Sequence, residues 1–219
     1  PDASIEKAIM PHITSANIAC GAHAGDAAIM ERTVRLARRH GVSIGAHPGY
    51  PDRANFGRRE LPLSAEEIAR TVYEQLLALA AFAPEFGYVK PHGALYNVAA
   101  KNPAVAEAIA RGVERYRRDL ILVGLAGSAM LEVWRGLGFS TAAEAFADRR
   151  YEPVGSLRPR AFADALIGDP AEAAAQALRL AARARTLCIH SDTPGAVRIV
   201  AAVAAGLRAA GVTLKPLAS

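Results

Sequence analysis

Short apolar runs alternate with longer amphipathic stretches along the whole chain. The β-prone runs predict strands at residues 15–20, 42–47, 87–91, 119–124, 140–146 and 186–191, and residues 212–214 are expected to add a short last strand. The stretches between them, with apolar residues at helical spacing, predict helices at 26–40, 64–82, 103–117, 127–136, 170–184 and 194–210. Regular alternation of this kind is typical of a parallel sheet covered by helices.

Local signals support these boundaries. Ser64 followed by Glu67 predicts a capping box at the start of the second helix. Prolines are expected in the first turn of three helices, at Pro103, Pro170 and Pro194. The long irregular stretches 48–63 and 148–163 are predicted to be functional loops.

The number of strand–helix units favours a (β/α) barrel over an open doubly wound sheet. No GxGxxG motif follows the first predicted strand, which also disfavours a dinucleotide-binding fold. The triplet Gly-Ala-His occurs at residues 21–23 and again at 45–47, one compact βα unit later. We therefore expect His23 and His47 to leave adjacent strands at the same level.

Composition narrows the class of protein. Apolar residues make up 52% of the chain and charged residues 21%, which is enough for a large core. The net charge is +5, but the arginines come singly or in pairs and few aromatic residues lie among them, so no nucleic-acid partner is expected. No apolar run is long enough to span a membrane and no leader pattern opens the chain. With two distant cysteines, a cytoplasmic location is expected.

Polar and titratable side chains collect at the ends of the predicted strands, where parallel barrels build their active sites. They are Asn17, His23 and Asp26 after the first strand, His47 after the second, Lys90 and His92 after the third, Glu144 and Asp148 at the fifth, and His190 and Asp192 after the sixth. Histidines that converge with a lysine and carboxylates predict a catalytic site. His12 and His40 lie elsewhere and are assigned no role in it.

These residue types fit two kinds of chemistry. Imidazoles and carboxylates beside Lys90 suit general acid–base attack on a carbonyl, in which the lysine stabilises developing negative charge. The same groups suit a divalent metal ion, although no HExxH motif is present. A nucleophilic Cys20 and a Schiff base at Lys90 are further alternatives, whereas neither GxSxG nor GxxxxGK[ST] occurs. Residue spacing does not separate these mechanisms.

Several longer segments, in order along the chain, resemble the LamB/YcsF family. They are residues 15–26 (SANIACGAHAGD), 45–52 (GAHPGYPD), 56–59 (FGRR), 89–97 (VKPHGALYN), 144–151 (EAFADRRY) and 190–194 (HSDTP). The family's acidic first strand, of the form DLNCDxGE, is not found before Pro1, so the chain is expected to lack that strand and its carboxylate. Ala22 and Ser191 stand where the family more often has Phe and Gly.

The resemblance implies an α/β fold in one domain over residues 1–219, a (β/α)7 TIM-like barrel related to the glycoside hydrolase and polysaccharide deacetylase barrels. It also implies ATP-dependent hydrolysis of the 5-oxoproline lactam to L-glutamate, together with two partner subunits, B and C, of a 5-oxoprolinase. A five-membered lactam is an unstrained amide that water attacks poorly. Phosphorylation of the amide oxygen would make it easier to attack, which would explain the ATP.

The reaction that the resemblance implies agrees with the residues found at the strand ends and in the first long loop, and we assign candidate roles to them on that basis. The catalytic candidates are His23, His47, Lys90, His92, Asp148 and His190. The candidates for substrate binding are Asn17, Asp26, Arg58, Arg59, Glu144 and Asp192. Within these sets, His47 or His92 is the candidate general base, and Lys90 stabilises negative charge. Arg58, Arg59 or Lys90 would bind the substrate carboxylate.

Alternatives remain for individual residues and for the whole chain. Asp148 and Asp192 would orient histidines or arginines, but Asp148 also suits a loop ion pair with arginine and Asp192 the N-cap of the last helix. The metal ligands stay open, with a divalent metal as one option. The alternative activity is a metal-dependent amidohydrolase or polysaccharide-deacetylase-like enzyme without ATP. A non-enzymatic alternative is a lactam- or carbohydrate-binding barrel that regulates a neighbouring enzyme.

Overall fold

A computed structural model describes residues 3–218 of the chain. The chain divides into two compact units. The larger unit contains residues 15–142 together with the end of the chain from residue 216, and the smaller unit contains residues 143–215 together with the first 14 residues. The predicted alternation of strands and helices is present in both units.

The larger unit is built on a parallel sheet of adjacent strands, in the order β1 (Ser15–Ala19), β2 (Ser43–His47), β3 (Tyr88–Val89) and β4 (Ile121–Leu125). In the β1–β2 register Ala19 lies opposite His47, and in the β2–β3 register Ala46 lies opposite Val89. The C-terminal ends of these three strands therefore lie at one level, which places the loops after β1, β2 and β3 at the same edge of the sheet.

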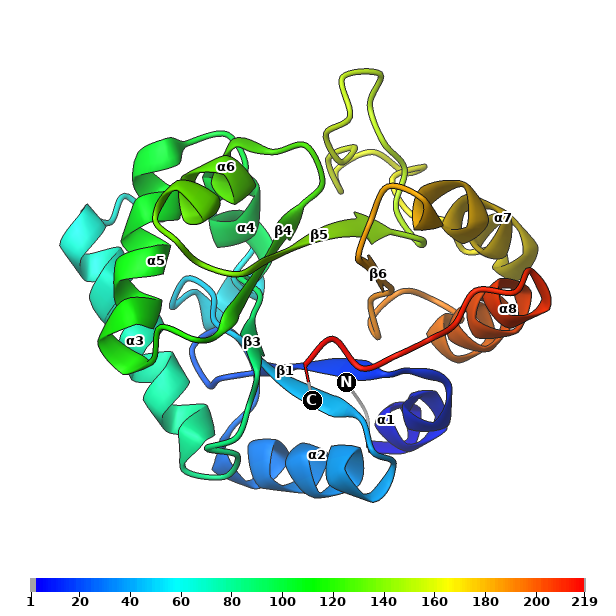
Figure 1. Ribbon diagram of the computed structural model, residues 1–219, viewed down its shortest axis with the longest axis horizontal. Coiled ribbons are helices and arrows are strands. Elements are labelled where there is room, and N and C mark those ends of the chain that lie inside the picture. The colour runs from blue at the N-terminus through cyan, green and yellow to red at the C-terminus, as the bar shows by residue number, and fades with distance from the viewer. Residues whose placement is uncertain (1–2, 219) are drawn as a thin grey trace. The chain divides into compact units, whose positions relative to one another are not determined.

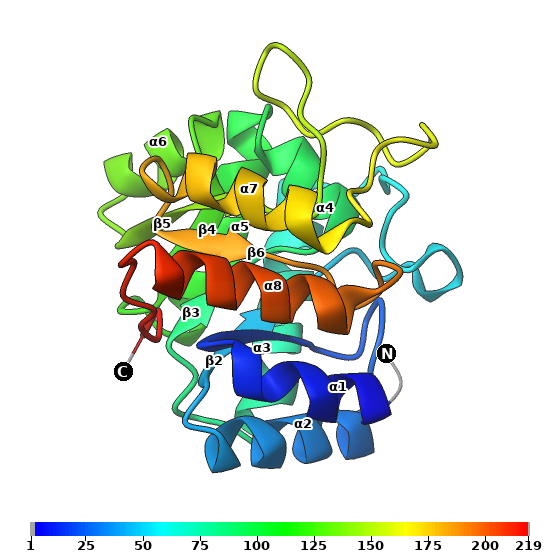
Figure 2. The same cartoon turned by 90° about the vertical axis from the view of Figure 1, so that its right-hand side faces the viewer.

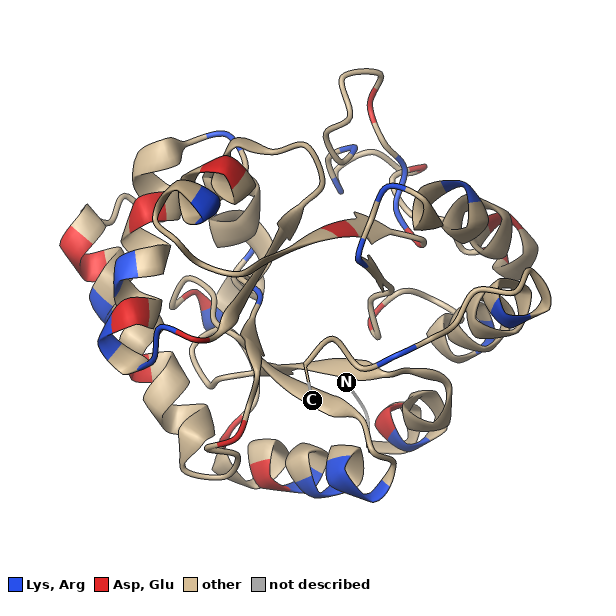
Figure 3. Ribbon diagram, in the orientation of Figure 1, with Lys and Arg blue, Asp and Glu red and all other residues tan. Residues whose placement is uncertain are grey.

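Amphipathic helices cover the outer side of this sheet, as Figure 1 shows for α2, α3, α5 and α6. The helical segments of the larger unit are α2 (Ala27–Arg39), the short 3₁₀ turn η2 (Arg53–Asn55), α3 (Ala65–Ala80), α4 (Gly93–Ala99), α5 (Pro103–Tyr116) and α6 (Ala129–Gly136). Figure 3 marks charged residues along the outer helices. Several of them form i,i+4 ion pairs, such as Arg35 with Glu31. The buried faces are apolar, as in α3 with Ile68, Val72 and Leu76.

The smaller unit contains most of β5 (Thr141–Phe146), paired in parallel with β6 (Thr186–Cys188). Its helices are α1 (Ala3–Ile9), the 3₁₀ turn η1 (Met10–His12), α7 (Pro170–Ala181) and α8 (Ala196–Ala209). Helices α7 and α8 lie side by side in Figure 2. Small residues such as Ala173 and Ala177 share a buried core cluster with Ile199. Ile9 of α1 packs against Val200 of α8.

Several details of the sequence prediction are confirmed. The predicted strands form at 15–20, 42–47, 87–91, 119–124, 140–146 and 186–191, all with shorter or slightly shifted bounds. The capping box is present, since the Ser64 side chain accepts from the Glu67 backbone N–H while the Glu67 carboxylate accepts from the Ser64 backbone N–H. Pro103 and Pro170 lie in the first turns of α5 and α7.

Other details were wrong. Residues 212–214 form no strand, because Val212 and Leu214 pack their side chains against the α7–α8 core instead of joining a sheet. The part of the chain that the structure describes therefore lacks the expected seventh strand. Pro194 precedes the helix, since Gly195 is the N-cap of α8 with a left-handed φ of 80°. Helices α1 and α4 were not predicted. Among the described residues, no helix has the length and apolar character to cross a membrane.

Candidate active site

Three of the predicted histidines lie together at the strand-end edge of the larger unit. His47 is the last residue of β2, His92 follows β3 and is the N-cap of α4, and His23 lies in the loop after β1. The ring of His23 stacks on that of His92, with centroids 3.9 Å apart and planes 4° apart. His47 meets His92 edge-on at a centroid distance of 4.8 Å.

The Gly-Ala-His repeat does not mark equivalent positions. His47 ends its strand, and its register partner on β1 is Ala19, so His23 lies four residues beyond the matching position. The expectation that both histidines leave their strands at the same level was wrong. The loop after β1 turns back, however, and brings the two rings to a centroid distance of 5.8 Å.

Hydrogen bonds fix the rings of His47 and His92. His47 Nδ1 is 2.6 Å from the carbonyl oxygen of Lys90, and His92 Nε2 is 2.8 Å from the carbonyl oxygen of Phe56. The remaining nitrogens, His47 Nε2 and His92 Nδ1, are 3.0 Å apart. In contrast, Nδ1 of His23 is buried without a hydrogen-bond partner among the described residues.

Two glycines of the loop after β2 allow it to close on these rings. A Cβ added at Gly49 would lie 2.8 Å from His23 Nδ1, and one added at Gly57 would lie 2.8 Å from His23 Cβ. Gly57 also has a φ of 65°, which favours glycine. The buried Gln75 of α3 holds the loop, since its amide accepts from the Gly49 N–H at 3.0 Å and donates to the Gly49 carbonyl at 2.8 Å.

Burial and positive neighbours lower the pKa values of His23 and His47. Burial, followed by the charges of His92, Arg53 and Arg58, lowers the pKa of His23 to about 3. Burial and the charges of His92 and Lys90 hold the pKa of His47 well below its ordinary value. His23 is therefore a neutral imidazole at pH 7.

Lys90 follows β3 directly and is 4% exposed, with its ammonium 5.9 Å from the centre of the Tyr96 ring. Its charge acts on His47, so it belongs to the same cluster. Arg58 is exposed, lies over the Phe56 ring at 5.0 Å and acts on His23 in the same way. A lysine ammonium and an arginine guanidinium beside these histidines provide a cationic site for an anion.

The other candidates of the larger unit have different surroundings. Asn17 lies mid-strand in β1 with its side chain exposed. Asp26 is the N-cap of α2 and accepts from the Ile29 N–H at 2.9 Å. Arg59 is exposed, and its backbone N–H donates to Asp52. Burial raises the pKa of Cys20 to about 12, so its thiol is not an activated nucleophile.

The smaller unit contains a second group, centred on the fully buried Asp148 after β5. Its carboxylate accepts from the backbone N–H of His190 at 2.9 Å, from His190 Nδ1 at 3.0 Å and from the Thr193 hydroxyl at 2.6 Å. Burial alone would raise the pKa of Asp148, but the charge and hydrogen bonds of His190 and the Thr193 bond outweigh it and lower this pKa to about 2.

This arrangement orients His190. Because a carboxylate can only accept, His190 carries its proton on Nδ1, which leaves Nε2 as the basic nitrogen. The ring also stacks on Phe146, with centroids 5.4 Å apart. A histidine oriented by a buried carboxylate in this way is the arrangement of a general base.

The remaining acidic candidates lie nearby in the smaller unit. Glu144 is buried in β5, and its charge helps to raise the pKa of Tyr151, which burial raises to about 12. Asp192 is 3.8 Å from the Arg160 guanidinium. It is not the N-cap of the last helix, because Gly195 takes that position.

The structure thus brings the predicted residues together in two groups, His23, His47, Lys90, His92 and Arg58 in the larger unit and Asp148 with His190 in the smaller one. Gln75 and Thr193 were missed. A glutamine on the apolar face of an amphipathic helix was the available signal for Gln75. Thr193 lies three residues after His190, within the segment 190–194 that resembles the family, and that segment was the available signal for it.

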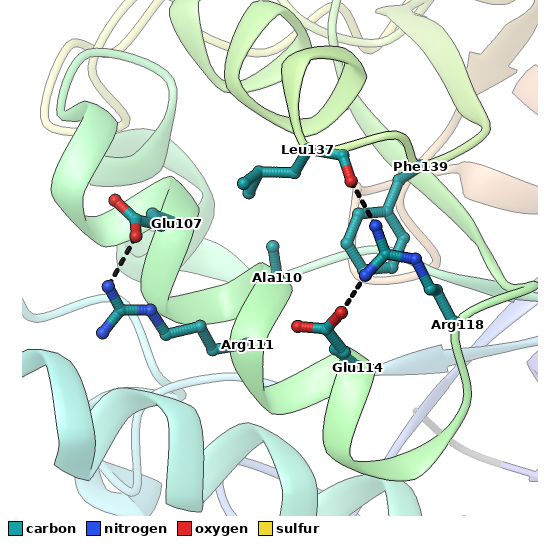
Figure 4. Close-up of a pocket in the computed structure, with 7 residues that line it drawn as sticks. All are labelled: Glu107, Ala110, Arg111, Glu114, Arg118, Leu137 and Phe139. Carbon is teal, nitrogen blue, oxygen red and sulfur yellow. Dashed lines mark hydrogen bonds and ion pairs between the residues drawn. The ribbon is translucent and has the colours of Figure 1, made fainter.

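Two further features of the described residues are relevant to the candidate site. Among residues 3–218, no group of three or more His, Cys, Asp or Glu side chains is arranged to hold a metal ion. A shallow cavity lies between α5 and the segment after α6, lined in part by Glu107, Arg111 and Phe139 (Figure 4). Its arginines already pair with glutamates, as in Arg111 with Glu107. It contains none of the candidate residues.

Comparison with known proteins places the chain among related sequences. Residues 2–219 match the model of the LamB/YcsF family. A protein of Chloroflexus aggregans that bears the name of the 5-oxoprolinase A subunit is 48% identical over 96% of this chain and 90% of its own length. A protein of the same name from Chloroflexus aurantiacus is 50% identical over 94% of this chain and 89% of its own length.

A solved structure shows the same fold. The crystal structure of a lactam utilization protein from Thermus thermophilus superposes with a TM-score of 0.90 and 41% sequence identity. The superposition covers 97% of this chain and 92% of that one.

Proposed function

Because this chain belongs to the LamB/YcsF family, we propose that it is the A subunit of a 5-oxoprolinase, an enzyme that hydrolyses the 5-oxoproline lactam to L-glutamate with ATP. The observation that carries this proposal is the identity of 48% over 96% of the chain to a relative of that name. The two groups of titratable residues supply chemistry that such a reaction needs.

In this proposal His190 is the general base that takes a proton from the attacking water at Nε2. The Asp148 carboxylate holds its Nδ1–H at 3.0 Å and stabilises the imidazolium that forms. The low pKa of Asp148, about 2, means that this carboxylate stays ionised throughout the reaction. The expectation that His47 or His92 is the base has less support, because both nitrogens of each ring already have hydrogen-bond partners.

Lys90 and Arg58 are the proposed anion-binding groups. The buried ammonium of Lys90 would stabilise negative charge that develops on the lactam oxygen. Arg58, exposed at the edge of the histidine cluster, would bind the substrate carboxylate through its planar guanidinium. His23 is neutral at pH 7 because its pKa is lowered to about 3, so it remains a candidate catalytic residue as a hydrogen-bonding group and not as a general acid.

ATP enters the proposal as a co-substrate that activates the amide. The sequence contains no GxxxxGK[ST] motif, so we propose that nucleotide binding depends on the complex with two further subunits, B and C. We also propose a cytoplasmic location and a single TIM-like barrel domain over residues 1–219. Asn17, Asp26, Arg59, Glu144 and Asp192 remain candidate substrate-binding residues.

The test is reconstitution of the chain with subunits B and C, 5-oxoproline and ATP, measuring glutamate and ADP. Release of both products only when all three proteins are present supports the proposal. Rapid glutamate release by the chain alone, or without ATP, would contradict it. A tightly bound zinc or manganese ion together with ATP-independent amide hydrolysis would favour a metal-dependent amidohydrolase.

A further inference from the structure

His47 and His92 use all four of their ring nitrogens within the protein. The outer nitrogens, His47 Nδ1 and His92 Nε2, lie 2.6 and 2.8 Å from the backbone carbonyl oxygens of Lys90 and Phe56. The inner nitrogens, His47 Nε2 and His92 Nδ1, face each other at 3.0 Å. Each of these distances is that of a hydrogen bond, so each contact needs one proton between its two atoms.

The number of protons in the pair follows from the acceptors. A backbone carbonyl oxygen cannot donate, so both outer nitrogens must carry hydrogen. Two neutral imidazoles have only one N–H each, and both would then be used on the carbonyls. The inner nitrogens would face each other with lone pairs at 3.0 Å. If one ring carried its proton on the inner nitrogen instead, the inner contact would be a hydrogen bond. The outer nitrogen of that ring would then face a carbonyl oxygen with no proton between the two acceptors.

The fully protonated pair is no better. Four ring protons would place two N–H groups against each other at the inner contact and two positive charges in a buried cluster. Three protons satisfy the two carbonyl contacts and the inner contact together. We propose that the His47–His92 pair carries three ring protons, one of them shared between His47 Nε2 and His92 Nδ1, and so holds one positive charge in the folded protein.

The surroundings determine where the charge lies. Lys90 and His23 act on His47, and the cations Arg53 and Arg58 act on the neighbouring His23. Lys90 carries a positive charge, so it opposes a second positive charge on the pair. The neutral ring of His23, stacked on His92 at 3.9 Å, offers its π face to a cationic imidazolium. Burial and neighbouring charge hold the pKa of His47 far down, which assigns the shared proton mainly to His92 and makes His47 the acceptor.

The pair is therefore a positioning group and not a proton donor to substrate. Neither ring can exchange a proton with a bound molecule unless one of these hydrogen bonds breaks. Its charge, next to Lys90, favours an anion at this edge of the sheet. On the proposed function, on which this last step rests, the anion is the carboxylate of 5-oxoproline.

The proton count can be measured directly on the complete chain labelled with ¹⁵N-histidine. Nitrogen chemical shifts between pH 6 and 8 distinguish protonated from unprotonated ring nitrogens. A coupling through the inner hydrogen bond identifies His47 and His92 without replacing either. Variants at His12, His40 and His190, which lie outside the pair, assign the other rings by elimination.

Three protonated nitrogens in the pair, unchanged across this pH range, are expected. Two protonated nitrogens, which means two neutral rings, or four, which means two imidazolium ions, would overturn the proposal. A second titration compares 5-oxoproline with its neutral amide. A shift of the His92 Nδ1 resonance with the acid alone supports the anion role. Equal shifts with the acid and the amide, or no shift with either, would overturn the anion-binding role and count against the proposed function. If three protonated nitrogens are still found, the proton count of the pair stands.

Discussion

Replacing Asp148 by asparagine tests whether the ionised carboxylate holds the smaller unit's candidate site together. The carboxylate is fully buried and accepts three hydrogen bonds, from the His190 backbone N–H, His190 Nδ1 and the Thr193 hydroxyl. The asparagine side chain would keep the shape but lose the charge, and its NH₂ group would face donors. Asp148→Asn is therefore expected to destabilise the protein and to release His190 from its orientation.

The size of the effect follows from the pKa of Asp148, which is lowered from 3.8 to about 2. A difference of this size contributes about 2 kcal/mol to the free energy of unfolding at pH 7. The unfolded chain binds the proton more tightly, so this contribution is present above about pH 4 and is lost as the pH falls through the folded pKa. At about pH 3 half of it, roughly 1 kcal/mol, remains.

The assay is urea unfolding of the wild type and Asp148→Asn at pH 7, 5 and 3. The gap in unfolding free energy should be about 2 kcal/mol or more at pH 7 and should narrow by about 1 kcal/mol at pH 3. The control is Asp119→Asn, because Asp119 pairs with Arg117 at 2.7 Å but is 72% exposed. That variant should change stability by less than about 1 kcal/mol. An equal gap for Asp148→Asn at pH 7 and pH 3 would show that the charge of this carboxylate is not what stabilises the fold.

Three further predictions concern the larger unit. Lys90→Met in the reconstituted complex should lower kcat by about 10²–10³-fold with the fold retained. Lys90→Arg should restore little of the lost kcat. Turnover by Lys90→Met within a few-fold of the wild type would rule out a catalytic role for Lys90. Gly57→Ala should lower the unfolding free energy by about 1–3 kcal/mol more than the control Gly127→Ala. Both glycines have a positive φ, but of the two only Gly57 would bring a Cβ to 2.8 Å from a side chain, that of His23. Equal losses of stability would argue against this close packing. The pKa of His23 is lowered from 6.5 to about 3, so below pH 6.5 the unfolded state binds a proton that the folded state does not. Between pH 7 and pH 5 the wild type should therefore lose about 2 kcal/mol more unfolding free energy than His23→Gln. Equal losses in the two proteins would contradict this.

The parts of the fold that follow from local pattern could be predicted from the sequence. Strand and helix periods, the Ser64–Glu67 capping box and the prolines at the starts of α5 and α7 depend on neighbouring residues alone. The local pattern of residues 212–214 also predicts a strand. Packing of Val212 and Leu214 on α7 and α8 decides the conformation of this segment instead. Burial against distant elements has no local signal.

Part of the candidate site was also predictable, because the ends of parallel strands meet at one edge. That rule placed His47, Lys90 and His92 correctly at the ends of β2 and β3. The precise roles depend on loops that return from elsewhere. The carbonyl of Phe56 occupies a nitrogen of His92, which weakens the expectation that His92 is the base. The orientation of His190 by Asp148 depends on a contact across 42 residues.

Base catalysis by His190, oriented by Asp148, is the step on which the proposed hydrolysis of 5-oxoproline depends. It is tested by the rate of glutamate formation in the reconstituted three-protein mixture containing either the wild-type chain or His190→Gln. We expect His190→Gln to lower kcat by about 10²–10⁴-fold, with the melting temperature and the binding of the partner subunits retained. Turnover by His190→Gln within a few-fold of the wild type would mean that another group takes the proton from water.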